Sequence, residues 1–312
     1  MGSQVYIAMV KQNPATPRVI PATPVMQKVN FKSDDLGDKI STKTSEHIRS
    51  DRATTDVTIT GIETLGGYEF EFQYENSLLD ELLLAFLWAE EWTEGGSLTS
   101  QAKNGSFYQP FFIERGHLGV SQYFKFIGMS ANTLSLEFKD QSDVTGSYQF
   151  VGLTSKEEGA IETGATYTEQ TDNPVFSCVT NMGDISIDGV AQDSCLVKEW
   201  TLEIDNQVTG KTGVGVMGAC ETNPHRMSIT GDLSMYFTDM AMQTRLKNGT
   251  PFSFSWTMTD SLANVYKFTL PRVKLESNEI FVEGEDDDEM NNASYVATYD
   301  KVTGCMIMIE KS

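Results

Sequence analysis

The sequence of 312 residues predicts a mainly β fold made of two similar halves, each containing one helix. Two observations carry this expectation. Apolar and polar residues alternate along several segments, and the order strand, helix, strand, strand occurs twice along the chain. Hydrophobic residues make up 39% of the chain, which is enough for a packed core.

Alternation with a period of two is clearest over Tyr68–Tyr74, where aromatic residues alternate with Glu69, Glu71 and Gln73. This pattern is typical of a strand with one buried face and one solvent-facing side. The same period predicts further strands at residues 134–139, 200–205 and 252–258.

One segment departs from the strand period. The stretch from Ser77 to Asp80 has a capping-box pattern, and the leucines that follow recur with Phe86 at helical spacing until Gly95 and Gly96. The spacing predicts an amphipathic helix in the first half.

The two halves echo one another in the order of their elements. Gly66 and Gly231 each precede an alternating strand, and each strand is followed by a helix, the second expected over residues 238–246 before Asn248 and Gly249. Two aromatic strands then follow each helix, at residues 107–113 and 123–134 in the first half and at 251–258 and 266–275 in the second. This order predicts an internal repeat, although few residues are identical between the halves.

Two segments interrupt the strand pattern. Residues 11–27 carry four prolines among Ala and Thr, so regular pairing is not expected to continue through them. Residues 154–173 are polar and nearly free of large apolar side chains, which is typical of a boundary. The predicted organisation is an extended N-terminal arm (1–30), a first β domain (31–155), a linker (156–173) and a second β domain (174–312).

The chain is strongly acidic, with 44 Asp and Glu against 23 Lys and Arg and a net charge of −21. Binding nucleic acid by counterion release, or anionic lipid by attraction, needs clustered Lys and Arg, so both are disfavoured. The longest apolar run, Leu82–Ala89, is too short to span a bilayer, and no export signal is expected. The four cysteines lie far apart, which favours free thiols.

No catalytic residue, metal site or cofactor is predicted. Residues 213–218 fit GxGxxG, but no helical pattern follows, so a glycine-rich loop between strands is favoured over a dinucleotide site. The histidines lack zinc spacing. Glu69 and Glu71 lie about 7 Å apart along one strand face, a separation a glycosidase could use. A solvated strand face is the favoured interpretation, because the polar stripe continues through Gln73 and Glu75.

Several segments of strand and helix pattern stand out as a set. In the first half they are residues 45–52 (SEHIRSDR), Gly66 with the aromatic strand and residues 77–83, and then 112–116, 123–129 and 132–136. In the second half the segment is 266–275 (YKFTLPRVKL). Together they resemble the tail tube proteins (major tail proteins) of long, non-contractile phage tails. The resemblance covers about residues 30–310, and the sequence departs from the family in the Pro-rich segment and in the acidic run 285–289.

The resemblance implies a structural virion protein rather than an enzyme. Tail tube domains are β-sandwiches with one flanking helix. Neighbours in a ring join their inner sheets around a channel, and stacked rings form the conduit for genome ejection. A duplicated domain favours rings of three copies with pseudo-sixfold symmetry, with a hexamer of the whole chain as the alternative.

The resemblance also implies partners and a location. The partners are further copies of the chain, the tape measure protein, the tail terminator and distal tail proteins. Double-stranded DNA would be a transient cargo that does not stick, and no membrane binding is expected. The location would be the virion tail, assembled in the host cytoplasm.

Two sets of residues follow as candidate sites. Glu69, Glu71 and Glu75 are expected to line the channel, with Asp232 and Ser234 as their counterpart in the second half, because carboxylates repel phosphates. Two long polar loops, residues 33–55 and 206–226, are expected to contact the neighbouring ring. The candidate contact residues are Arg49, Arg52, Lys211, Gly213, Gly215 and Arg226.

Two alternative classes stay open from the sequence. One is another β-structural protein of phage or secretion systems, such as a tail terminator, a baseplate ring or a contractile-type inner tube. A terminator should stop as a ring, whereas a tube subunit should polymerise. The other is a carbohydrate-binding or hydrolytic β-sandwich, which would need a compact cluster of aromatic residues or carboxylates on loops.

Overall fold

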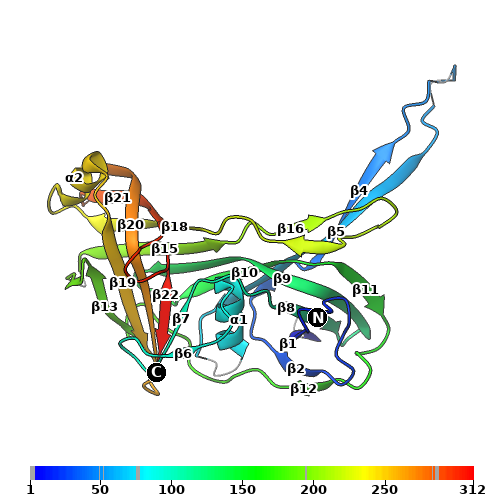
Figure 1. Cartoon of the computed structure of the whole chain (residues 1–312), viewed down its shortest axis with the longest axis horizontal. Helices are drawn as coiled ribbons and strands as arrows, with labels where there is room; N and C mark the ends of the chain where they lie inside the picture. The colour runs from blue at the N-terminus through cyan, green and yellow to red at the C-terminus, as the bar shows by residue number, and fades with distance from the viewer. Residues whose placement is uncertain are drawn as a thin grey trace.

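The computed structural model describes residues 4–48, 50–51, 53–74, 78–193, 195–282, 284 and 288–312. As predicted, it is mainly β, with two helices in this part of the chain, α1 (Leu78–Leu87) and α2 (Ala241–Asn248) (Figure 1). The strands are β1 (Val5–Lys11), β2 (Val25–Lys28), β3 (Ser33–Asp34), β4 (Gly37–Thr44), β5 (Val57–Glu71), β6 (Thr93–Glu94), β7 (Ser100–Lys103), β8 (Pro110–His117), β9 (Gln122–Lys139), β10 (Thr145–Val151), β11 (Thr154–Glu158), β12 (Thr166–Thr168), β13 (Met182–Ile187), β14 (Val190–Ala191), β15 (Val197–Asp205), β16 (Thr209–Lys211), β17 (Glu221–Asn223), β18 (Ser228–Tyr236), β19 (Phe252–Thr259), β20 (Val265–Phe281), β21 (Met290–Ala297) and β22 (Met308–Lys311).

One sheet runs through both halves of the chain. Its strand order is β4–β5–β10–β9–β15–β18–β21–β20, with every neighbouring pair antiparallel. The halves meet where β9 pairs with β15, from Lys139 opposite Glu199 to Thr133 opposite Asp205. The strands of the second half therefore extend the sheet of the first.

The long strands β9 and β20 each belong to two layers. The first part of β9 pairs with β8 and β11, and its last part lies in the sheet that spans both halves. In the same way, β20 pairs first with β19 and β22 and then with β21. Each strand has one extra residue in its pairing with the next strand, Asn132 in β9 and Glu276 in β20. Such bulges bend a strand, which allows it to connect two layers.

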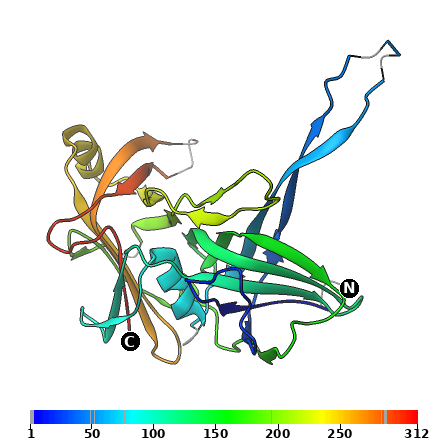
Figure 2. The same ribbon diagram turned by 45° about the vertical axis from the view of Figure 1, so that its right-hand side comes forward.

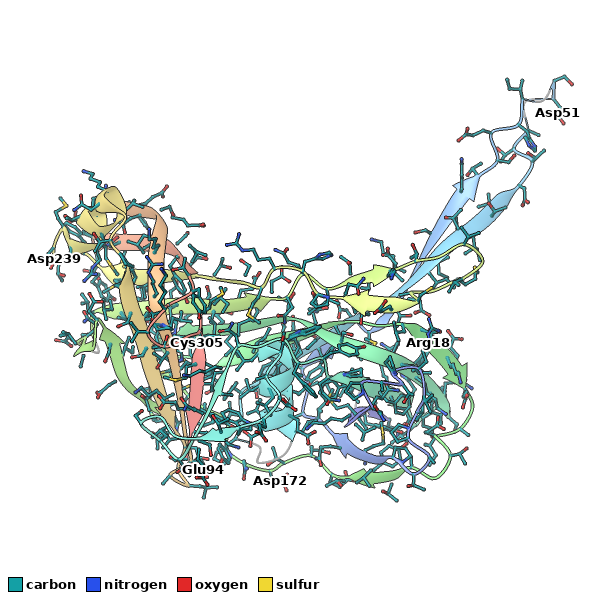
Figure 3. The ribbon with its side chains drawn as sticks, in the orientation of Figure 1. Arg18, Asp51, Glu94, Asp172, Asp239 and Cys305 are labelled. Carbon is teal, nitrogen blue, oxygen red and sulfur yellow. The ribbon has the colours of Figure 1, made fainter. Side chains whose placement is uncertain are left out.

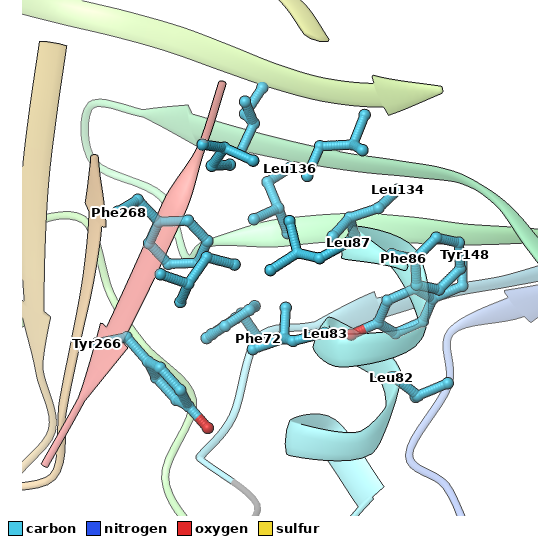
Figure 4. Packing of buried hydrophobic residues seen from close by; sticks show 14 of the residues in the cluster. Phe72, Leu82, Leu83, Phe86, Leu87, Leu134, Leu136, Tyr148, Tyr266 and Phe268 are labelled. Carbon is cyan, nitrogen blue, oxygen red and sulfur yellow. The ribbon is translucent and has the colours of Figure 1, made fainter. Parts of the chain in front are cut away.

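A single apolar cluster fills the space between the layers and continues from one half to the other (Figure 4). Phe72 of the first half lies 5.8 Å from Tyr266 of the second, measured between ring centroids. Phe138 and Trp200 stack at 4.7 Å across the β9–β15 junction. Because these contacts cross from one half to the other, the halves share one core. Each such side chain stabilises the fold by about 1.5–3 kcal/mol when it is fully buried.

Both predicted helices are present, and both are shorter than the pattern suggested. α1 ends at Leu87 because Trp88 has a left-handed φ of 52°, well before Gly95. α2 is followed by Gly249, whose φ of 60° lets its N–H donate to the last helical carbonyls. The predicted capping residue Ser77 lies outside the described residues.

The segments predicted as arm and linker contribute strands to the first half. Residues 5–11 form β1, which pairs along its length with β8, and Ile7 and Met9 are fully buried. The prediction of an extended arm over residues 1–30 was therefore wrong for β1 and β2, because the apolar run at the start of the chain has a core to enter. Within the predicted linker, β12 pairs in parallel with β2. The residue boundaries of the two halves stay predictions.

A buried ionic network fastens this linker to the first half. The Lys125 ammonium, only 1% exposed, lies 3.1 Å from the Glu162 carboxylate. The Glu114 carboxylate is buried beside it and accepts hydrogen bonds from the hydroxyls of Tyr6 and Tyr167 and from the Glu162 N–H. Partnered charges of this kind tolerate burial, so the linker lies packed on the first half.

Two hairpins extend from the sheet that runs through both halves, here called the spanning sheet. One is formed by β4 and the first part of β5, and it is called the arm from here on, distinct from the predicted N-terminal arm. The arm projects far from the body, whereas the second hairpin, β16–β17, lies along the body (Figures 1 and 2). Figure 3 shows Asp51 at the far tip of the arm, remote from Arg18 and from the rest of the chain. In the part of the chain that the structure describes, no helix has the length and apolar character needed to cross a membrane.

Candidate functional site

The solvent-facing side of the spanning sheet is a continuous polar surface, here called the polar face. Cross-strand partners in a sheet share a face, so the strand register shows which side chains lie on it. One row of partners crosses β5, β10, β9 and β15, and it continues through β18, β21 and β20. The row consists of Glu71, Thr145, Glu137, Thr201, Asp232, Ser294 and Ser277.

The structure brings together four of the residues predicted to line a channel. Glu69 and Glu71 lie on the polar face in β5, and Asp232 and Ser234 lie on the same face in β18. The first three are exposed, whereas Ser234 is buried and donates a hydrogen bond of 2.6 Å to the Asn292 side chain. Glu75 lies outside the described residues.

The polar face carries more acidic residues than those predicted from the sequence to line a channel. Further carboxylates come from strands between and beyond the two predicted groups. Alternation had placed residues 134–139 and 200–205 in strands, but it did not reveal that these strands would stand side by side. The additional residues are Glu137, Glu199, Glu203 and Glu279.

The electrostatic character of the polar face is negative with local compensation. The Lys32 ammonium lies 3.8 Å from the Glu71 carboxylate, and the Lys139 ammonium lies 3.9 Å from that of Glu199. These pairs are exposed and contribute little stability. A hollow in this face is lined by Glu137, Glu199, Asp232, Ser234 and Glu279 among others. It therefore offers mainly hydrogen-bond acceptors.

The spanning sheet ends in two open edges. The last part of β20 pairs with β21 on one side and with no described strand on the other. At the opposite end, β3 and β4 pair with β5 and with no other described strand. An open edge exposes unpaired N–H and C=O groups, which favours pairing with another chain.

The predicted ring-to-ring loops fall on the two hairpins. Lys211 is in β16, exposed, with its ammonium 3.4 Å from the Glu221 carboxylate of β17. Gly213 and Gly215 lie in the turn between these strands, as expected of a glycine-rich loop, and Arg226 is exposed just after β17. Arg49 and Arg52 lie outside the described residues.

The buried titratable groups have structural partners. Burial raises the pKa of the Asp80 carboxyl, while the neighbouring Lys311 ammonium acts in the opposite direction. The Tyr266 hydroxyl donates to the same carboxylate at 2.9 Å, which ties α1 to β20 and β22. No three His, Cys, Asp or Glu side chains converge as a candidate metal site within the described ranges.

Comparison with known proteins identifies the family. No curated protein matches the chain. A family model of the phage tail tube protein, however, matches residues 2–299, which is nearly the whole sequence. The match agrees with the β-rich fold and with the polar sheet face between two open edges. The chain therefore belongs to the phage tail tube protein family, whose members are structural components of the virion tail.

Proposed function

We propose that three copies of the chain form a closed ring, and that stacked rings form a hollow tube through which the phage genome leaves. The observation that carries the proposal is the sheet that spans both halves and ends in an open edge on each side. Open edges at both ends allow head-to-tail pairing, which closes into a ring when the rotation permits. Because each chain supplies two similar halves, three copies would give pseudo-sixfold symmetry, and six copies are the alternative.

In such a ring the polar face would line the channel. Glu69, Glu71 and Asp232 are exposed on that face and would meet the phosphates of double-stranded DNA. Like charges repel, and a surface of carboxylates offers few donors to phosphate oxygens, so DNA could slide without binding. Glu75 is proposed to continue this lining.

The hairpin tips are proposed to contact the neighbouring ring. The turn of β16–β17 exposes Val214, and the candidate contact residues Lys211, Gly213 and Gly215 lie beside it. Arg49, Arg52 and Arg226 are proposed to act with them. In the virion, the tube would contact the tape measure protein, the tail terminator and the distal tail proteins, after assembly in the host cytoplasm.

Electron microscopy of concentrated protein tests this function. We expect hollow filaments with a regular axial repeat, and a reconstruction should place Glu69 and Glu71 on the channel wall. Single rings that never stack would instead indicate a terminator, and a monomer at every concentration would contradict the proposal. Deleting residues 210–218 should leave the fold intact and prevent filaments, because it removes the turn of β16–β17. Normal tubes from that variant would refute the role given to this loop.

A further inference from the structure

We propose that neighbouring copies join through a repeat of the joint that connects the two halves within one chain. The β4 edge and the arm of one copy would lie against the β20 edge of the next copy. This inference rests on the proposed function, since it requires copies to meet side by side.

The two halves contribute matching strands to the spanning sheet. β4, β5, β10 and β9 of the first half occupy the same relative places as β15, β18, β21 and β20 of the second. The bulges match as well. In β9, Asn132 is the extra residue beside Thr133, and in β20, Glu276 is the extra residue beside Ser277. This makes Ser277 the counterpart of Thr133.

The hairpins of the two halves also match. In the arm, β5 carries one extra residue, Thr60, because Gly61 pairs with Ser41 and Ile59 pairs with Thr42. In the second half, the pairing also shifts by one residue between the β15–β18 ladder and the β16–β17 ladder. Counting along the paired strands, the arm residues Lys39, Ile40, Thr42 and Val57 correspond in that order to Asp205, Asn206, Val208 and Thr222.

The same face of the two hairpins has different surroundings. In the second half it is docked on the first, so Asn206, Val208 and Thr222 are only 2%, 6% and 7% exposed. The Thr222 hydroxyl lies 2.7 Å from the Ser130 hydroxyl of β9. The Asn206 side chain donates to the Phe86 carbonyl at the end of α1.

On the arm, this face is apolar and uncovered. Ile40 and Val57 are each 55% exposed, and Ile59, which lies on the same face, is 50% exposed. An apolar stripe on a projecting hairpin marks a contact surface, and the matching face in the second half shows what such a stripe can cover. The occupant we assign is the second half of a neighbouring copy.

The internal joint supplies the register of the external one. Asp205 stands opposite Thr133 within the chain, so Lys39 should stand opposite Ser277 of the neighbour. Thr222 contacts Ser130, so Val57 should lie beside Lys274. Charge at the centre of this register is complementary, because the exposed Lys39, opposite Ser277, would also lie beside the exposed Glu276 of the β20 edge.

Disulfide trapping in assembled tubes tests the register. In a background with the exposed native thiols removed (Cys195→Ser, Cys220→Ser), the pair Lys39→Cys and Ser277→Cys should cross-link copies under mild oxidation. The covalent ladder should end at three copies, because a closed ring offers no further partner. The matched control moves only one thiol, using Lys43→Cys with Ser277→Cys. Four residues along a strand is about 13 Å, too far for a disulfide.

The internal joint provides the positive control, since Thr133→Cys with Asp205→Cys should form a disulfide within each chain. Tubes in which this internal bond forms but the Lys39–Ser277 bond does not would overturn the register while leaving the proposed function intact. Equal cross-linking of the Lys43 pair would also overturn it. Failure to form any ring or tube would contradict both the register and the proposed function. A ladder ending at six would uphold the register and replace the three-copy ring with a hexamer.

Discussion

The two helices occupy equivalent places in their halves, but their surroundings differ. In α1 all the residues except Glu81 are buried, whereas in α2 only Met242 is. α1 lies at the middle of the molecule, in contact with β9 and β7 (Figure 1). β7 in turn pairs with β22 of the second half. α2 lies at the outer end of the molecule, against β20 (Figure 1). The same element is thus buried at the joint between the two halves and exposed near the free edge of the spanning sheet.

This difference shows how position in a repeat shapes sequence. Leu83, Phe86 and Leu87 of α1 enter the shared core, and their helical spacing was visible in the sequence (Figure 4). The sequence of α2, with Gln243, Arg245 and Lys247, is that of a surface helix. The helix that is covered by both halves of the chain, α1, is mostly apolar, and its counterpart near the free edge of the sheet, α2, is mostly polar.

The largest expected effect comes from the same substitution in each helix. Leu83→Ala should lower the free energy of unfolding by about 3 kcal/mol, because it leaves a cavity in a fully buried site. Leu246→Ala, at a partly exposed site, should lower it by about 1 kcal/mol or less. Denaturant unfolding followed by tryptophan fluorescence measures both values. Equal losses would show that the two helices are equally important to the core.

A comparable effect is expected at the ionic contact between α1 and β22. Lys311→Met should lower the free energy of unfolding by about 3 kcal/mol, because the buried Asp80 carboxylate loses its cation. Asp80→Asn added to Lys311→Met should restore part of the loss, since no charge is then left unpaired. The matched control, Lys301→Met at an exposed site, should change stability little. A loss from Lys311→Met that the second substitution does not reduce would contradict this role for Asp80.

A smaller effect concerns the pH dependence of stability. Burial raises the pKa of Asp80 in the folded protein, so its contribution to stability is present below pH about 4 and is lost as pH rises through the folded pKa. Hydrogen bonds from the Thr303 backbone and side chain lower the pKa of Asp300, so its contribution is present above pH about 4 and is lost as pH falls. Relative to the parent, Asp80→Asn should therefore lessen the decline of stability above pH 4, and Asp300→Asn should lessen the decline below it. The free energy of unfolding of both variants is measured from pH 2 to 8. A decline above pH 4 that is unchanged in Asp80→Asn, or a decline below pH 4 that is unchanged in Asp300→Asn, would contradict this assignment.

The sequence predicted the period of the elements better than their arrangement. The alternation around Glu69 and Glu71 and the helical spacing around Leu83 depend on local residues, and both predictions of element type hold. The opening residues of β1 were predicted as an arm because nearby prolines dominated that interpretation. Their apolar side chains instead enter the core once β8 is available as a partner.

The arrangement of the polar face depends on contacts between residues far apart in the chain. Glu137 and Glu199 lie on neighbouring strands only because β9 pairs with β15. No local pattern reports such a pairing, so Glu137 and Glu199 were not among the residues selected from the sequence, whereas Glu69 and Asp232 were. The internal repeat was the one long-range signal in the sequence, and it pointed to matching halves without showing that they share a sheet.

The β9–β15 joint has a consequence for the kinetics of assembly. Because both strands belong to one polypeptide, this joint closes as an intramolecular step whose effective concentration, on the order of millimolar for linked partners, does not change when the protein is diluted. In the proposed ring of three such chains, only three of the six joints would lie between separate molecules, so two encounters would bring the ring together where six unlinked domains would need five. Half of each ring would be completed during folding, before any two subunits meet.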